Sequence, residues 1–322
     1  MKNFWGLLPK PIFALAPMED VTDAAFRRLI ARYGKPAVMF TEFTSADGLV
    51  LAPPEAQKML RKKLIYDESE RPIVAQLFSA IPERMERAAA LVQELGFDGL
   101  DINMGCPVDD VVKSGCGAAL INDPLLAQEL IRAGRRGAPH LPISVKTRIG
   151  YRENTLDTWL PTLLSEGIAA ITIHARTRNE MSAVPAHWDA VAQAVQIRDR
   201  LRSKTLILGN GDARDLAHAQ ELARESGADG IMLGRAIYGN PWLFSNRTSP
   251  PSPQERIGAL IEHLELFDEL LSDTTHYAVM KKHFKAYISG WDGAKELRIH
   301  LMETQSSREA KTTLERAISH FS

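Results

Sequence analysis

Short runs of apolar residues recur along most of the chain, and they limit the possible folds more than any other feature. Eight runs occupy residues 12–16, 38–41, 73–77, 99–103, 143–147, 170–174, 206–210 and 230–234. Each is short, rich in β-branched residues and bounded by turn signals, as expected for a fully buried parallel strand. Helix-length segments separate several of them, at residues 23–33, 82–95, 124–136, 154–166, 188–200 and 213–226.

About eight strand–helix units in roughly 245 residues predict a closed α/β barrel, the (β/α)8 TIM barrel. A doubly wound open sheet is the alternative architecture. We favour the barrel because the number of units is right and no G-x-G-x-x-G motif follows the first run. In such a barrel, functional residues gather at the carboxyl ends of the strands.

The residue composition and the periodicity of the sequence change after residue 245. Residues 246–253, Asn-Arg-Thr-Ser-Pro-Pro-Ser-Pro, are turn formers and prolines typical of a linker. Residues 254–322 show only helical patterns, including a stripe formed by Ile257, Leu260, Ile261, Leu264 and Phe267. We therefore predict a barrel domain at 1–245, a linker, and a small all-α helical domain at 254–322.

Composition restricts the setting in which the chain works. Of its 322 residues, 45% are hydrophobic, and the formal net charge is −1. No run approaches the roughly 20 apolar residues that span a bilayer, and prolines and a lysine interrupt the first residues before a signal peptide could form. We expect a cytoplasmic protein without a membrane partner, in which both cysteines are reduced.

A polar residue lies at or just after the carboxyl end of nearly every predicted strand. The residues at these ends are Met18, Glu19, Glu42, Gln76, Asn103, Lys146, His174, Asn210, Gly234 and Arg235. A ring of such groups predicts a lined cavity at the barrel mouth. Glycines and an arginine at residues 209–212 and 234–236 favour a phosphate site after the last two strands.

Lys146 and His174 each allow more than one interpretation. An ammonium in an apolar strand needs an anion or a strong acceptor, so Lys146 could form a Schiff base, hold the N1/O2 edge of a flavin, or pair with Asp101 or Glu42. His174 could satisfy a backbone carbonyl or, with Arg176 and Arg178 close behind it, help to form an anion-binding rim.

The Gly105-Cys106-Pro107 turn places a thiol at the end of the fourth strand. A metal site is not expected, because nine residues separate Cys106 from Cys116 and there is no C-x-x-C motif or nearby histidine. No adjacent base would convert the thiol to a nucleophilic thiolate. A mostly protonated thiol suits proton donation; the alternative is that Cys106 is a buried packing residue. Cys116 is expected to be a packing residue.

At this point the sequence resembles the FMN-dependent tRNA-dihydrouridine synthases of the bacterial type. The resemblance covers nearly the whole chain and rests on an ordered set of motifs. They lie at residues 15–23, 41–43, 75–77, 101–107, 113–118, 145–150, 174–177, 209–212 and 232–236. Each motif is weak alone, whereas the ordered set is very specific.

The resemblance implies the role of each site residue. FMN would be bound by Ala16, Pro17, Met18, Gln76, Lys146, His174, Asn210, Gly211, Asp212, Gly234 and Arg235. Hydride would pass from NADPH, with NADH as the alternative donor, to FMN and then from flavin N5 to C6 of a flipped-out uracil. Cys106 would protonate C5, and Asn103 and Arg176 would contact the substrate.

The basic run from His276 to Lys285 predicts the tRNA contact of the helical domain, through Lys281, Lys282 and Lys285. An ordinary solvated helix face is the alternative. We expect a monomer without a metal. Other functions considered are a reductase of a free small molecule, similar to dihydroorotate dehydrogenases, an aldolase or isomerase that uses Lys146, and a non-catalytic RNA-binding module.

Overall fold

Parallel strands form the centre of the structure, a computed structural model that describes residues 3–245 and 247–319. Along the sheet the order is β1 (Ile12–Leu15), β9 (Gly230–Leu233), β8 (Leu206–Asn210), β7 (Ala170–His174), β6 (Ile143–Arg148), β5 (Gly99–Met104), β4 (Ile73–Phe78) and β2 (Met39–Phe40). The short β3 (Thr44–Ser45) pairs with β4.

The barrel closes between its first two strands. The Leu15 amide donates to Val38 O (3.2 Å) and the Ala37 amide donates to Phe13 O (2.9 Å), and a parallel bridge joins Ala14 to Val38. The predicted barrel is therefore confirmed, and all eight predicted strands are present.

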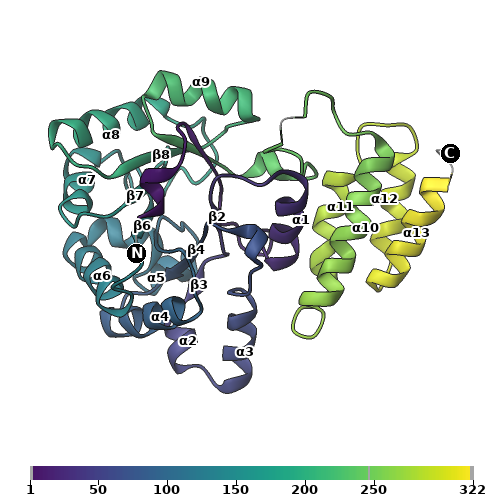
Figure 1. Cartoon of the computed structure of the whole chain (residues 1–322), viewed down its shortest axis with the longest axis horizontal. Coiled ribbons are helices and arrows are strands. Elements are labelled where there is room, and N and C mark those ends of the chain that lie inside the picture. The colour runs from purple at the N-terminus through teal and green to yellow at the C-terminus, as the bar shows by residue number, and fades with distance from the viewer. Residues whose placement is uncertain (1–2, 246, 320–322) are drawn as a thin grey trace.

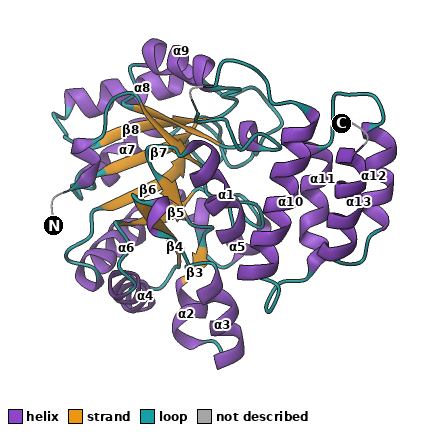
Figure 2. Cartoon of the chain, turned by 45° about the vertical axis from the view of Figure 1, so that its right-hand side comes forward, coloured by secondary structure: helices purple, strands orange, loops and turns teal. Residues whose placement is uncertain are grey.

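Helices surround these strands (Figure 2). They are α1 (Ala24–Gly34), α2 (Ala46–Leu51), α3 (Pro54–Lys62), α4 (Pro82–Glu94), α5 (Asp109–Lys113), α6 (Pro124–Gly137), α7 (Leu156–Leu164), α8 (Trp188–Arg200) and α9 (Leu216–Ser226). Helix α4 shows why they form: Pro82 occupies its first turn, and Met85, Ala88, Ala89 and Val92 are its buried residues. Helix α9 starts at Leu216, three residues after the predicted start, because the Asp215 carboxylate caps it by accepting from the His218 amide.

In the part of the chain that the structure describes, four α-helices follow the barrel and lie beside it (Figure 1). They are α10 (Pro253–Leu270), α11 (Lys281–Tyr287), α12 (Ala294–Glu303) and α13 (Ser307–Ser319). Helix α10 begins at the last residue of the predicted linker, because Ser252 and Glu255 form a capping box there. The predicted all-α C-terminal region is thus present, while the predicted boundary between two domains stays a prediction.

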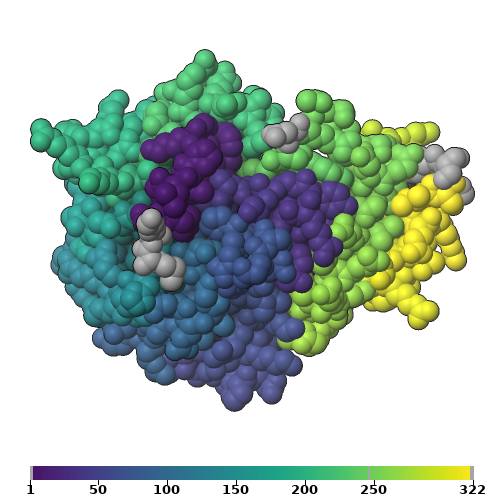
Figure 3. Space-filling view, in the orientation of Figure 1, coloured from purple at the N-terminus to yellow at the C-terminus, as the bar shows by residue number. Residues whose placement is uncertain are grey.

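The C-terminal helices pack against the first helix of the barrel. The Phe26 ring of α1 lies 5.2 Å from the His263 ring of α10 and 5.4 Å from the His283 ring of α11. One buried hydrophobic cluster contains residues of both the barrel and these helices. In Figure 3 the green surface of α10 and α11 meets the indigo surface of the first strand–helix units. In the part of the chain described here, no helix combines the length and the apolar character needed to cross a membrane.

Candidate active site

A cavity of about 220 Å³ opens at the carboxyl ends of the strands. Its lining residues are Ala16, Pro17, Met18, Lys146, His174, Arg176, Ser182, Asn210, Gly211, Asp212, Ala213, Met232, Gly234 and Arg235. The structure therefore brings together all the residues expected to bind the cofactor except Gln76, together with Arg176. Gln76, Asn103 and Cys106 do not line this cavity.

Lys146 places a cation on the wall of this cavity. Its Nζ donates to Asn210 Oδ1 (3.2 Å), and Asn210 Nδ2 donates to Met232 O (2.8 Å), which fixes the orientation of the amide. Burial, together with the nearby Arg148 guanidinium, lowers the pKa of Lys146 to about 8. Among the described residues, no ion pair joins Lys146 to Asp101 or Glu42, so the ammonium keeps N–H groups for a ligand.

His174 and two arginines form a second connected set of side chains on the lining of the cavity. Arg176 Nη1 lies 3.1 Å from His174 Nε2, and Arg176 also forms an ion pair with Asp212. Arg235 Nη2 donates to the second Asp212 oxygen (2.7 Å).

These contacts fix the charges of these side chains. Burial lowers the pKa of His174 to about 2, so the imidazole is neutral. Since the Arg176 guanidinium must donate to Nε2, the proton of His174 is on Nδ1. The hydrogen bond from Arg176 lowers the pKa of Asp212. Arg176 and Arg235 together exceed the single charge of Asp212 by one positive charge.

The glycines of the cavity leave room for a ligand. Gly211 has φ +136°, and a Cβ on it would lie 2.8 Å from Ala186 Cβ and 3.5 Å from His174 Cδ2. At Gly234 a Cβ would project toward Ala16 Cβ and Met18 Sδ, both 3.6 Å away. A side chain at either position would narrow the cavity. Such a cavity, lined by the apolar Ala16–Met18 segment and by the cations of Lys146, Arg176 and Arg235, fits a flat anionic cofactor.

Gln76, Asp101 and Asn103 form a buried chain of side chains behind the cysteine turn. Gln76 Nε2 donates to Asp101 Oδ2 (2.7 Å) and Asn103 Nδ2 donates to Gln76 Oε1 (2.9 Å). Burial raises the pKa of Asp101 to about 6. Asn103 Oδ1 accepts from the amides of Gly105 (3.1 Å) and Cys106 (2.9 Å). The observed contacts of Gln76 and Asn103 thus hold the backbone that carries Cys106.

Cys106 is 8% exposed, and its amide is the last group in this series of hydrogen bonds. Burial raises the pKa of its thiol, which stays protonated at neutral pH. Its carbonyl accepts from the Ala118 amide (3.0 Å). Gly117 leaves space beside it, because a Cβ there would lie 2.7 Å from Cys106 O. Cys116 is buried, as expected for a packing residue, and its Sγ lies 3.8 Å from Ser114 O.

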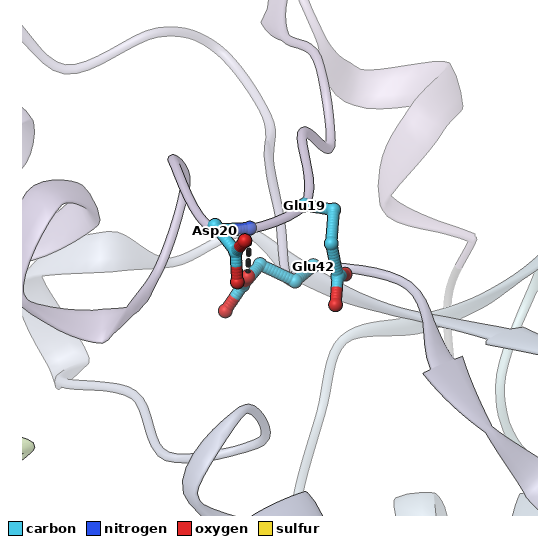
Figure 4. A group of neighbouring side chains, drawn as sticks. All are labelled: Glu19, Asp20 and Glu42. Atoms are coloured by element: carbon cyan, nitrogen blue, oxygen red, sulfur yellow. Dashed lines mark hydrogen bonds between the residues drawn. The ribbon is translucent and has the colours of Figure 1, made fainter. Parts of the chain in front are cut away.

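Three carboxylates, those of Glu19, Asp20 and Glu42, meet where β1 and β2 end (Figure 4). Their oxygens lie within 4.8 Å of one another. The Asp20 amide donates to Glu42 Oε1 (2.6 Å), and Lys63 pairs with Glu19. Burial raises the pKa of Glu42 to about 7. These contacts tie the loop after β1 to the end of β2.

The sequence did not reveal every residue of the site. Ser182 and Ala213 line the cavity from loops, where no periodic signal marks a residue that points inward. Met232 lies on β9, two residues before Gly234, so strand alternation could have identified it. Arg148 is 5% exposed, and Arg148 Nε donates to Gly105 O (2.8 Å). Its position at the end of a predicted strand was the available signal.

The three lysines expected to contact the substrate lie on α11, away from the lining of the cavity. Lys282 and Lys285 are exposed. Lys281 Nζ donates to Met302 O (2.8 Å) and lies 6.0 Å from the centre of the Tyr277 ring. Among the described residues, the ammonium groups of Lys282 and Lys285 have no hydrogen-bond or ion-pair partner, whereas that of Lys281 is already engaged.

Comparison with known proteins identifies the family. A family model described as "Dihydrouridine synthase (Dus)" matches residues 14–322, a range that contains every residue of the cavity described above. The chain belongs to the dihydrouridine synthase family. It is 42% identical over 316 residues to "Probable tRNA-dihydrouridine synthase 2" of Bacillus subtilis (strain 168), covering 98% of this chain and 96% of that protein. It is 41% identical over 316 residues to "Probable tRNA-dihydrouridine synthase" of Staphylococcus aureus (strain COL), covering 98% of this chain and 95% of that protein.

Solved structures agree on the fold. Histamine dehydrogenase from Rhizobium sp. 4-9 matches with a TM-score of 0.55 at 13% identity, over 79% of this chain and 48% of that one. The 2-naphthoyl-CoA reductase complex matches with a TM-score of 0.56 at 12% identity, over 72% of this chain and 49% of that one. The predicted family and the predicted enzyme class, an oxidoreductase that forms dihydrouridine, are confirmed by the family match.

Proposed function

We propose that this chain reduces uridines of tRNA to 5,6-dihydrouridine, with FMN as its resident cofactor and NADPH as the electron donor in the cytoplasm. The family match over residues 14–322 is the observation that carries this proposal. The cavity supports it, because an apolar wall, a buried lysine and an arginine pair face a space that glycines keep open.

Different residues of the cavity would bind different parts of the cofactor. Ala16, Pro17 and Met18 would pack against the ring system. Lys146 would hold the N1/O2 edge, where negative charge gathers on reduction, with Asn210 keeping its ammonium in place. Arg235 and the backbone of Gly211 and Gly234 would bind the ribityl chain and phosphate, and neutral His174 would donate through Nδ1. When bound and reduced, FMN supplies the hydride that adds to C6 of the uracil.

Cys106 completes the reduction as the proton donor. Its Sγ–H gives a proton to C5 of the uracil, and the thiolate then recovers a proton from water. Because burial raises the pKa of Cys106, the thiol form that donates persists at neutral pH. The chain from Asp101 through Gln76 and Asn103 to the Cys106 amide keeps this donor in a fixed position.

Replacing Cys106 with Ala tests the assignment. Loss of a positioned general acid should lower dihydrouridine formation by about 100-fold or more, measured by mass spectrometry of nucleosides from tRNA isolated from a strain that lacks the protein. FMN content should not change. Cys116→Ala is the matched control, since it removes the other buried thiol, and it should keep near wild-type turnover. Equal turnover by Cys106→Ala and wild type would refute the role of Cys106, and absence of dihydrouridine with wild type would refute the function itself.

A further inference from the structure

Met181 is an exposed apolar residue held in an unusual backbone conformation at the barrel mouth. Its side chain is 48% exposed and its φ is +50°. A positive φ is uncommon outside glycine and strains a bulky residue unless the surroundings impose it. The next residue, Ser182, lines the cavity that contains Lys146 and Met18. Met181 therefore stands at the entrance of the proposed active site.

A buried guanidinium determines where Met181 stands. Arg148 Nη1 donates to Met181 O (3.0 Å) and to Thr177 O (2.8 Å), while Arg148 Nε donates to Gly105 O (2.8 Å) beside Cys106. Arg148 is only 5% exposed, and its guanidinium thus joins the loop of residues 175–187 to the turn of residues 105–108.

Contacts at the surface reinforce the same connection. Arg178 pairs with Asp109, and the Arg178 amide donates to Gly150 O (3.0 Å). Within the loop, the Thr177 amide donates to Glu180 Oε2 (2.7 Å) and the Met181 amide donates to Arg178 O (3.2 Å). The turn that exposes Met181 is therefore rigid. On the cysteine side, Val108 is a second exposed apolar residue, 50% exposed and two positions after Cys106.

In the proposed reaction, the base stack that the uracil leaves is a suitable partner for such an apolar residue. A uracil that reaches Cys106 must leave its stack in tRNA, and unstacking costs a few kcal/mol. Proteins that distort nucleic acids insert apolar side chains, Met among them, into the opened step. A thioether also makes favourable contacts with aromatic rings.

We propose that Met181 is the wedge that fills the gap left in the tRNA stack when the target uridine enters the barrel. This inference rests on the proposed function. Arg148 is the positioning residue that holds the wedge at a fixed place relative to Cys106.

The test uses the FMN-loaded full chain with Met181→Ala, Met181→Gly and Met181→Leu. Met181→Gly removes the side chain and also relieves the positive φ, so loss of the wedge is separated from backbone strain. In single-turnover oxidation of the reduced flavin by saturating tRNA, Ala and Gly should each slow the reaction about tenfold, which corresponds to about 1.4 kcal/mol. Leu should stay within about twofold of wild type. Reduction of the flavin by NADPH without tRNA should be unchanged in all three variants.

A second readout follows the stack directly. The tRNA carries 2-aminopurine next to the mapped target uridine, and its fluorescence reports unstacking on binding. Met181→Ala and Met181→Gly should reduce the fluorescence increase, whereas Leu201→Ala should not, because Leu201 is equally exposed (49%) but follows α8 at the opposite end of the barrel. Wild-type rates and fluorescence in both the Ala and Gly variants would overturn the wedge and leave the proposed function intact. Absence of any dihydrouridine with the wild-type protein would overturn both.

Discussion

Individual side chains of the site differ in how far their surroundings shift their pKa values. His174 and Lys146 both lie at the cavity, and burial lowers the pKa of both groups. His174 becomes permanently neutral, and it can only donate or accept hydrogen bonds. Lys146 retains its charge at neutral pH because its pKa falls only to about 8. The cavity therefore pairs a fixed neutral donor with a cation whose charge depends on pH.

Lys146 gives a prediction about cofactor binding. Binding of FMN should weaken as the pH rises through about 8, because the protonated lysine that attracts the anionic ring edge is lost above its pKa. The dissociation constant is measured from quenching of FMN fluorescence between pH 6.5 and 9.5. Lys146→Met keeps the length of the side chain without the charge, and it should bind FMN about tenfold or more weakly at pH 7 with a flat pH profile. A wild-type profile that is equally flat would show that this ammonium does not hold the cofactor.

At the scale of elements, the sequence predicts the strands well and the contacts between them poorly. The eight buried runs identify the barrel, since their periodicity and spacing are local properties. Gln76, in contrast, contacts Asp101 and Asn103 because the register of β4 on β5 places Gln76 opposite Asp101. Register is a relation between distant segments, and no single run encodes it. Met181 was missed for a different reason, because an irregular loop has no period to interpret.

The interface of α1, α10 and α11 contains two buried histidines whose ring nitrogens lack partners. His263 is 0% exposed and His283 is 1% exposed, and their rings lie 4.8 Å apart. Neither nitrogen of His263 has a hydrogen-bond partner among the described residues, nor does His283 Nδ1. Burial lowers the pKa of His283 to about 3 and that of His263 well below its ordinary value, and the Lys282 ammonium adds to both effects. Both rings are neutral in the folded protein.

This pair predicts acid sensitivity. Between about pH 4 and 6 the unfolded chain binds protons at these histidines and the folded chain does not, so the free energy of unfolding must fall as the pH drops below about 6.5. His263→Phe keeps an aromatic ring against Phe26 and removes one such proton. In urea unfolding, it should reduce the slope of the free energy against pH by about 1.4 kcal/mol per pH unit relative to wild type.

The exposed His140 provides the control for this measurement. His140→Gln should leave the slope much closer to that of wild type, because the His140 side chain is exposed and stays in contact with water in the folded protein. Identical slopes in wild type and His263→Phe would mean that the folded state accommodates the imidazolium at this interface.

On the scale of the whole molecule, recognition of a polyanion has to be local. The net charge of −1 supplies no overall attraction. Cations between the barrel and the C-terminal helices already join the two parts, since Lys62 pairs with Asp273 (2.9 Å) and Arg32 with Glu262 (2.5 Å). Lys282 and Lys285 differ from these, because they are exposed and form no ion pair within 4 Å in the residues described.

Helix α11 orients these two lysines by its amphipathic pattern. His283, Phe284 and Tyr287 face the core, so Lys282 and Lys285, three residues apart, share the opposite face. If each contacts one phosphate, Lys282→Glu with Lys285→Glu should weaken tRNA binding and reduce the slope of log K against log salt by about two. Lys295→Glu, a charge reversal at an exposed position of α12, is the control and should leave that slope unchanged. Filter binding between 50 and 200 mM salt measures all three proteins, and parallel salt dependences for wild type and the double variant would place the phosphate contacts on another surface. A smaller slope in the double variant alone would instead place about two phosphate contacts on α11.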